Sequence, residues 1–382
     1  MVKDNSKSLV EESSYLWKGS PKVFKKEIDD SNPYTVVDLF CGAGGASYGF
    51  QSAGFNVILG IDHLIPALKT FQNNHKNAST ILGEIQDVTP DMIKNLLGDT
   101  PVKVLIGGVP CQGFSLNNRK RREDDPRNQL FYEFVRFIKI LKPEMIMLEN
   151  VSGMRSMKNG EVVETIKAEI IAAGKEIGKD YNVDFKMLNA ADYGVPQLRN
   201  RLIFLGGSSD YNITFPKPKF APENYRTVRD AIGDLPSLKP KENKREYDKE
   251  PVSEYQKLMR KDSKFLFNNQ APNHPQATVD RIKNTLPGEP MYPRYKQRIR
   301  LCWDNPSPTQ VCGGIRPQFQ FGHPEDNRGL TIRERARIQS FPDTFKFTGG
   351  MVQERVQTGN AVPPLLAQAI AENLYLELSK EH

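Results

Sequence analysis

The sequence has little cysteine and no long apolar run. Its 382 residues include four cysteines, Cys41, Cys111, Cys302 and Cys312, and no two of these form a Cys-x-x-Cys pair. This spacing predicts neither a disulfide framework nor a zinc site, and we expect no metal. No apolar stretch approaches the roughly 18 residues that a membrane-spanning helix needs, and the polar N-terminus lacks the apolar core of a signal peptide. We therefore expect a cytoplasmic protein with reduced thiols.

The positive charge and the prolines are concentrated in one region. The formal net charge is +7, and residues 207–328 contain 21 lysines and arginines against 15 aspartates and glutamates. The same region holds 15 of the 27 prolines and few periodic segments. Such a basic, irregular region predicts a loop-rich second domain with a polyanionic partner. An ordinary solvated surface is the alternative.

Alternating strand and helix patterns occupy the first half of the chain. Residues 1–33 look like a poorly ordered polar arm. After it, we expect strands at 35–40, 56–61, 102–106, 145–148, 181–188 and 202–205. Amphipathic helices are expected from about 46 and at 65–74, 130–141 and 162–173. This order predicts an α/β fold with a doubly wound sheet. A regular segment returns at 331–341, and a last helix over 365–378 should pack on the first domain.

One cysteine stands where ligands collect in such a sheet. Cys111 lies in the sequence GGVPCQGFS, directly after the apolar run 102–106. The carboxyl edge of an open α/β sheet is its usual ligand-binding edge, so a thiol on a proline-stiffened loop there is a candidate nucleophile. A buried, unreactive cysteine is the alternative.

A glycine-rich turn follows the first expected strand. The sequence DLFCGAGG (38–45) opens a helix, and Asp62 ends the second strand 20 residues after Gly42. Glycines let a ligand approach the backbone, and an acid at that position suits a ribose hydroxyl. NAD and S-adenosylmethionine both fit this pattern, although the glycine spacing is imperfect for a pyrophosphate and so favours S-adenosylmethionine. A tight turn without a ligand is the alternative.

Three more polar features accompany the cysteine. Glu149 ends the strand at 145–148, where a carboxylate can act as a general acid. Arg199 and Arg201 alternate along a strand, so both should lie on one face and could bind an oxygen and a carboxylate. The basic run 118–122 could hold phosphates. The alternative for Glu149 is helix capping or ion pairing. For the two arginines it is a surface ladder, and for the basic run it is a solvated loop.

Six motifs in order resemble those of cytosine-C5 DNA methyltransferases. They are DLFCGAGG (38–45), GGVPCQGFS (107–115), ENV (149–151), QLRNRLIFLG (197–206), LTIRERARIQSFPD (330–343) and QTGNAVP (357–363). The resemblance implies a Rossmann-like domain that binds S-adenosylmethionine and a smaller, irregular target-recognition domain. By this resemblance the catalytic domain covers 34–206 and 357–382, target recognition 207–328, and a motif-bearing hinge segment 329–356.

The resemblance also implies a role for each site residue. Cys111 would add to C6 of a flipped-out cytosine, Glu149 would bind N3 and the amine, Arg199 would contact O2, and Arg201 would orient Glu149 or the loop. Cofactor contacts would come from Phe40, Gly42, Gly44, Asp62, Glu84, Ile85, Pro110 and Asn360. Asp87 is an alternative to Glu84, where relatives usually carry Asp, and Cys41 is expected to line the pocket.

DNA contacts are the least defined part of this expectation. Gln112 or Asn117 would fill the gap left by the flipped base, and further contacts would come from Ser115, Arg119, Arg127 and Arg316. Bases could also be read by arginines and glutamines of the recognition region, namely Arg294, Arg298, Arg300, Arg316, Gln318 and Gln320.

The expected product is 5-methylcytosine within a specific short duplex sequence, with S-adenosylhomocysteine as by-product. We expect a monomer that does not contact a membrane and whose cognate restriction endonuclease, if one exists, is related by function rather than by contact. The alternatives are a tRNA methyltransferase, a catalytically silent relative and an NAD oxidoreductase. The RNA-acting branch carries Cys-Phe-Thr, whereas the four cysteines here precede Gly, Gln, Trp and Gly.

Overall fold

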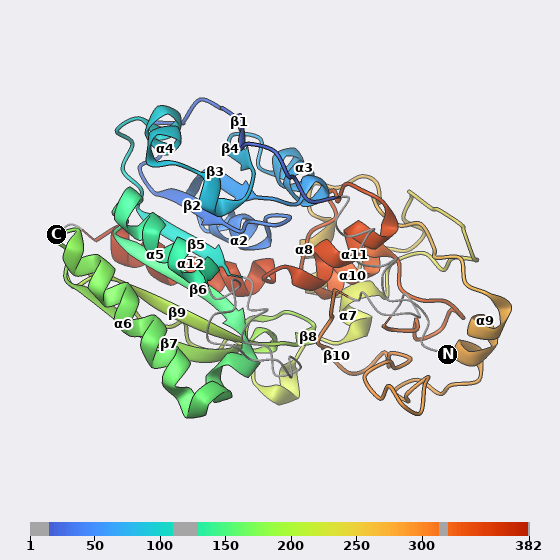
Figure 1. Ribbon diagram of the computed structural model, residues 1–382. Coiled ribbons are helices and arrows are strands. Elements are labelled where there is room, and N and C mark those ends of the chain that lie inside the picture. Colours follow the sequence, from blue (N-terminus) through green and yellow to red (C-terminus); the bar gives the residue numbers. More distant parts are fainter. Residues whose placement is uncertain (1–14, 110–128, 313–319, 381–382) are drawn as a thin grey trace, which may run out of the picture. The chain divides into compact units, whose positions relative to one another are not determined.

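The computed structural model describes residues 15–109, 129–312 and 320–380, and the chain divides into two compact units (Figure 1). The first unit comprises Met1–Leu188, Asn200–Lys217 and Leu366–His382. The second comprises Asn189–Arg199 and Pro218–Leu365. These limits differ from the boundaries drawn from sequence, because the motif segments up to residue 365 lie with the second unit. No helix in the described ranges is both long and apolar enough to cross a membrane.

An eight-stranded sheet forms the centre of the first unit, in the order β1-β4-β3-β2-β5-β6-β9-β7. Strands β4, β3, β2, β5 and β6 are parallel neighbours, whereas β1 and β9 run antiparallel to β4 and β6 respectively. The strands are β1 Lys22–Phe24, β2 Thr35–Leu39, β3 Asn56–Asp62, β4 Ser79–Leu82, β5 Val104–Gly108, β6 Met145–Val151, β7 Tyr181–Asn189 and β9 Asn200–Ser208.

Helices cover this sheet and bury its apolar residues. Side chains of α4, α5 and α6 share one hydrophobic core with the strands, while aromatic contacts join Tyr375 of α12 to Phe55 and Tyr34. The terminal helix therefore packs on the first unit over most of its length, as its pattern predicts. The helices are α2 Gly45–Ser52, α3 Ile65–Asn74, α4 Pro90–Leu97, α5 Gln129–Leu141, α6 Glu161–Glu176 and α12 Pro364–Leu378.

The α/β fold predicted from sequence is confirmed, but three elements in the described part of the first unit were not predicted. Lys22–Phe24, within the expected arm, pairs with Ser79–Leu82, and neither strand was expected. Both are short, and three residues carry too little pattern to signal a strand. The helix Pro90–Leu97 was also missed, although Thr89 caps its N-terminus and a proline stands at its start.

The second unit has little regular structure, as its prolines predict. Its helices are α7 Val228–Ile232, α8 Glu254–Arg260, α9 Gln276–Lys283, α10 Ile332–Ile338 and α11 Met351–Asn360. Two short parallel strands, β8 Gln197–Leu198 and β10 Ser307–Pro308, pair within it. One of its apolar clusters joins α7, α8 and α10.

Helix α10 is unusual because it buries three arginines. Arg333 donates to the carbonyl oxygens of Phe267, Pro342 and Phe345, at 2.9, 2.9 and 2.6 Å. Arg337 binds the carboxylate of Asp343 with two hydrogen bonds of 2.7 Å and also pairs with Asp234. Each guanidinium therefore fixes loops that have no regular backbone ladder of their own.

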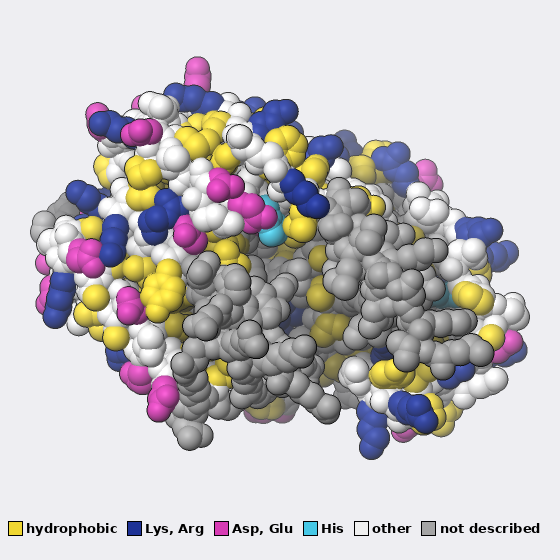
Figure 2. Space-filling model, in the orientation of Figure 1, with side chains coloured by type: hydrophobic (Ala, Val, Ile, Leu, Met, Phe, Trp, Pro, Cys, Tyr) yellow, Lys and Arg dark blue, Asp and Glu magenta, His cyan; other side chains and the backbone are white. Residues whose placement is uncertain are grey.

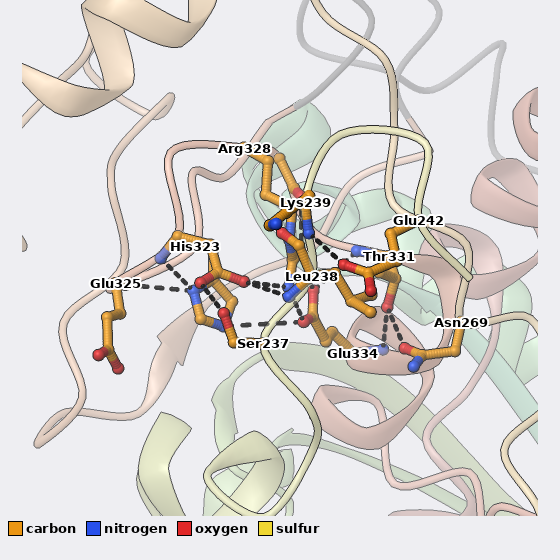
Figure 3. Close-up of polar contacts among 12 residues, drawn as sticks. Ser237, Leu238, Lys239, Glu242, Asn269, His323, Glu325, Arg328, Thr331 and Glu334 are labelled. Carbon is orange, nitrogen blue, oxygen red and sulfur yellow. Dashed lines mark hydrogen bonds and ion pairs between the residues drawn. The ribbon is translucent and has the colours of Figure 1, made fainter. Parts of the chain in front are cut away.

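A second buried cluster lies at the N-terminus of α10 (Figure 3). Arg328 forms a bidentate pair with Glu334, at 2.9 and 2.8 Å, and an ion pair of 2.8 Å with Asp326. Glu334 also accepts a hydrogen bond from the Thr331 amide, which completes a capping box. The nearby cation and hydrogen bonds lower the pKa of Glu334 despite the opposing effect of burial. The cluster is therefore ionised at neutral pH.

Replacing Glu334 with glutamine should destabilise the protein by about 3 kcal/mol, because it leaves a buried guanidinium short of one negative charge. Arg328 and Glu334 have side-chain exposures of only 2% and 1%. Glu254→Gln is the matched control, since Glu254 pairs with Lys257 at 84% and 55% exposure and should contribute less than about 1 kcal/mol. Denaturant titrations would measure both. Equal, small losses would show that the buried pair adds no stability.

Candidate active site

The predicted site residues of the first unit lie at the carboxyl edge of the parallel strands. The register pairs Leu39 of β2 with Ile61 of β3 and with Gly107 of β5, and Gly108 with Glu149 of β6. The chain leaves each of these strands at the same edge of the sheet. The glycine turn and Glu84 therefore follow β2 and β4, and Asp62 and Glu149 lie in the carboxyl-terminal parts of β3 and β6, as expected for a doubly wound sheet.

Backbone geometry in the glycine turn makes room for a ligand. Phe40, Gly42 and Gly44 have left-handed φ angles of 57°, 54° and 92°. A Cβ atom added to Gly42 would meet no atom within 4 Å. The amides of Gly42 and Leu64 donate to the two carboxylate oxygens of Asp62, at 2.8 and 2.7 Å. Asp62 thus holds the turn against β3, and its oxygens keep capacity for further hydrogen bonds.

Buried polar groups under the turn were not identified from sequence. The Ser47 hydroxyl donates to Asp38 at 2.6 Å, and burial raises the pKa of the Asp38 carboxyl to about 7. Burial and the neighbouring carboxylates of Asp62 and Asp38 raise the pKa of the Cys41 thiol well above its usual range. Cys41 is therefore a protonated, buried thiol and not a nucleophile. The sequence signal for this buried cluster was Asp38, an aspartate inside an apolar strand.

His75 supports the turn from α3. Its Nε2 lies 3.1 Å from the Gly44 carbonyl oxygen, and its Nδ1 lies 3.0 Å from the side-chain oxygen of Gln51. Burial lowers the pKa of His75 to about 4, so the ring is neutral at physiological pH. A Cβ atom on Gly44 would lie 2.3 Å from Nε2 of this ring. Only glycine fits there.

The turn after β4 holds the next two predicted residues. Glu84 is half-exposed and contacts Nδ1 of His63 at 3.0 Å, while Ile85 is buried. Asp87, the alternative to Glu84, is exposed. Arg136 of α5 donates to the carbonyl oxygens of Ile85 and Val88, at 2.8 and 2.9 Å. This positioning contact was missed, since an arginine on an amphipathic helix gives no such signal.

Glu149 and Arg201 form the other half of the edge. Because β9 runs antiparallel to β6, Arg201 pairs in register with Val151, and its Nε lies 2.7 Å from Oε1 of Glu149. Both side chains are largely buried, at 12% and 11% exposure. Asn150 donates from Nδ2 to the carbonyl oxygen of Val109, at 3.4 Å. It thereby holds the end of the chain segment that leads into Pro110 and Cys111.

The structure corrects the placement of Arg199. Alternation predicted that Arg199 and Arg201 would share one face, but Arg199 belongs to the second unit and is fully buried there. Its guanidinium donates to the carbonyl oxygens of Gln310, Gly359 and Ala361, at 2.8, 2.8 and 3.1 Å. The regular strand breaks between β8 and β9 at this residue, so simple alternation does not apply. Asn360 ends α11 in the second unit and is exposed.

Several predicted residues lie outside the described ranges. They are the nucleophile candidate Cys111 and its neighbour Pro110, together with the expected DNA contacts Gln112, Ser115, Asn117, Arg119, Arg127 and Arg316. Among the described residues, no cluster of three or more His, Cys, Asp or Glu side chains could hold a metal ion.

Comparison with known proteins decides the family. Residues 34–376 match the model of the C-5 cytosine-specific DNA methylases. The chain is 39% identical to the Type II methyltransferase M1.HphI of Haemophilus parahaemolyticus over 350 residues, which cover 88% of this chain and 86% of that protein. It is also 39% identical to the Type II methyltransferase M.DdeI of Desulfomicrobium norvegicum, covering 89% and 88% of the two chains. The chain belongs to the C-5 cytosine-specific DNA methylase family.

Solved structures agree with this assignment. A crystal structure described as a prophage-encoded DNA modification methyltransferase of Escherichia coli has a TM-score of 0.76 and 26% identity, over 91% of this chain and 99% of that one. The protein is therefore a DNA cytosine-C5 methyltransferase with the α/β fold of S-adenosylmethionine-dependent enzymes. The family assignment confirms the resemblance seen in the six motifs and disfavours the NAD oxidoreductase alternative.

Gly44→Ala should strongly destabilise this methylase, because the new Cβ would overlap the buried ring of His75. Gly178→Ala is the control: Gly178 also has a left-handed φ, of 78°, but a Cβ there would meet nothing within 4 Å. The control should lose about 1–2 kcal/mol, the ordinary cost of that backbone conformation. Denaturant titration of both variants would separate the overlap from the backbone cost. Equal losses would refute the role of His75.

Proposed function

We propose that Cys111 is the nucleophile of the methyl transfer. Its thiolate adds to C6 of a cytosine turned out of the duplex, which makes C5 nucleophilic. Once C5 has gained the methyl group, it loses its proton and the thiolate leaves C6, so the ring regains its double bond. The support is positional: Cys111 is the third residue after the end of β5, and β5 lies beside the strand that carries Glu149.

We propose that Glu149 accepts a hydrogen bond from the exocyclic amine of the flipped base and donates a proton to N3 as a general acid. The bond from Arg201 holds one oxygen of the Glu149 carboxylate, which leaves the other oxygen for the base. Arg201 also donates to the Asn200 carbonyl oxygen, at 2.8 Å, and its remaining N–H groups can reach O2 of the base. We assign O2 to Arg201 rather than to Arg199, whose guanidinium is occupied by three carbonyl oxygens.

The glycine turn fits S-adenosylmethionine, which supplies an electrophilic methyl group. The open space at Gly42 admits a ligand next to the backbone, and the free oxygen capacity of Asp62 suits a ribose. Phe40 offers an aromatic face on which adenine can stack. Glu84 and Ile85 would contact the polar edge of the adenine. The carboxyl groups of Asp62 and Glu84 along this side favour a cationic sulfonium over an anionic pyrophosphate. We expect Gly44, Pro110 and Asn360 to complete the cofactor site.

We further propose double-stranded DNA with a short target sequence as the substrate, and the second unit as the target-recognition domain. The named relatives are Type II methyltransferases, which is consistent with a cognate restriction endonuclease acting on the same sequence. The excess of positive charge in residues 207–328 supports a nucleic-acid partner. We expect the enzyme to act as a monomer in the cytoplasm.

Cys111→Ala should abolish methylation and leave S-adenosylmethionine binding unchanged, because the thiol makes the bond to C6 but does not hold the cofactor. Tritiated S-adenosylmethionine and mixed-sequence DNA would measure transfer, and calorimetry would measure binding. The unaltered enzyme should also be trapped covalently on DNA that contains 5-fluorocytosine, where fluorine cannot leave as a proton does. Full turnover by the variant, or no trapping, would overturn the role of Cys111.

Glu149→Gln should lower kcat about 10²–10⁴-fold, the usual effect of removing a general acid or base, with little change in DNA affinity. Glu144→Gln is the control, since Glu144 precedes the same strand at its other end and pairs with Lys179 at 2.8 Å. It should retain near-normal kcat. Single-turnover kinetics would separate the chemical step from product release. A loss of DNA affinity with unchanged kcat would contradict the proposed role.

A further inference from the structure

The structure sorts the residues that sequence suggested as base readers. Arg300 is buried and donates to the carbonyl oxygens of His323, Ile282, Thr285 and Glu325, at 3.2, 3.1, 3.1 and 2.9 Å. Gln320 is buried too: its amide group donates to the Thr309 carbonyl oxygen, and its side-chain oxygen accepts from the Val311 amide.

Arg298 is likewise only 7% exposed and stacks on the Tyr295 ring at 4.5 Å. These three side chains therefore support the fold and do not read bases. Arg316 and Gln318 lie outside the described ranges, which leaves Arg294 as the exposed candidate.

Arg294 stands at the tip of a compact hairpin, residues 288–300. The Met291 amide donates to the Arg298 carbonyl oxygen at 2.8 Å, and the Arg300 amide to that of Glu289 at 3.0 Å. Pro290 and Ile299 form an antiparallel bridge between its two arms. The hydrogen bonds from Arg300 to carbonyl oxygens in and after α9 hold the base of the hairpin against α9. The tip is therefore presented on a rigid support.

The hairpin carries an excess of positive charge. Residues 288–300 contain four arginines and lysines and one acid, Glu289. Arg294 and Lys296 are exposed, and within the described ranges neither is part of an ion pair. Arg281 and Lys283 of adjacent α9 are exposed as well, and Arg281 stacks on Tyr292 of the hairpin at 4.5 Å. Figure 2 shows dark blue side chains at the end of the second unit where Figure 1 places α9.

We propose that the tip of the 288–300 hairpin, with Arg281 and Lys283, binds phosphates of the DNA backbone. This inference rests on the proposed DNA substrate and adds the surface that holds it. Two of the four cations are lysines, which bind phosphate as point charges and lack the planar fork that reads guanine. The surface therefore contributes affinity and orientation, and it does not select the sequence.

The double variant Arg294→Gln/Lys296→Gln tests the proposal. Removing one phosphate-binding cation should reduce the steepness of log K against log salt by about 0.9, so the double variant should show a reduction of about 1.8 for any duplex. The control Lys249→Gln/Lys264→Gln removes the same charge from exposed sites elsewhere in the second unit and should leave the slope nearly unchanged. Anisotropy with two mixed-sequence duplexes, titrated over salt, would measure both.

Restoring the charge separates phosphate binding from a structural effect. Arg294→Lys/Lys296→Arg should keep the unaltered slope, and kcat at saturating DNA should be the same in all variants. Equal slopes for the test and control variants would overturn the proposal, as would an effect confined to one DNA sequence, which would indicate base reading instead. If the unaltered enzyme itself fails to bind or methylate duplex DNA, the proposed substrate is wrong and this inference is wrong with it.

Discussion

The parallel pairing of β2, β3, β5 and β6 is the constraint on which the site depends. Because Leu39 pairs with both Ile61 and Gly107, and Gly108 pairs with Glu149, the segments that follow these strands all begin at one edge. A shift of one residue would turn each side chain to the opposite face of the sheet. The antiparallel strand β9 adds the last component, since only that direction places Arg201 beside the end of β6. The pairing register of the strands, more than any loop, therefore determines where the site residues lie.

The second unit is held together in a different way, by buried arginine side chains. Because its loops lack the backbone ladders of a large sheet, buried guanidinium groups satisfy many of its carbonyl oxygens. Arg199, Arg300 and Arg333 each donate to three or more of them. A guanidinium suits this task because its five donors lie in one rigid plane. Arginine content in this unit therefore overstates the charge available to DNA, and only the exposed side chains can supply it.

Elements whose residue pattern reflects backbone periodicity could be predicted from the sequence. The strand at 35–39, the helices at 65–74 and 129–141 and the edge position of Glu149 all follow from apolar spacing. Prediction failed where tertiary contacts decide: Arg199 and Arg201 are two residues apart in sequence but belong to different units, because the strand is interrupted between them. His75 and Arg136 gave no sequence signal, since each acts on a backbone carbonyl oxygen that only the folded chain brings near.

The distribution of charge along the edge determines the protonation state of Cys41. Cys41 lies beside Asp38 and Asp62, and both carboxylates oppose formation of a thiolate. That environment suits a cationic ligand and keeps Cys41 protonated and inert toward an electrophilic methyl group. On the β6 side, by contrast, Arg201 offsets the charge of Glu149. The same sheet edge thus has an acidic region around Cys41 and a neutralised region at Glu149, which accords with the proposed positions of the methyl donor and the flipped base.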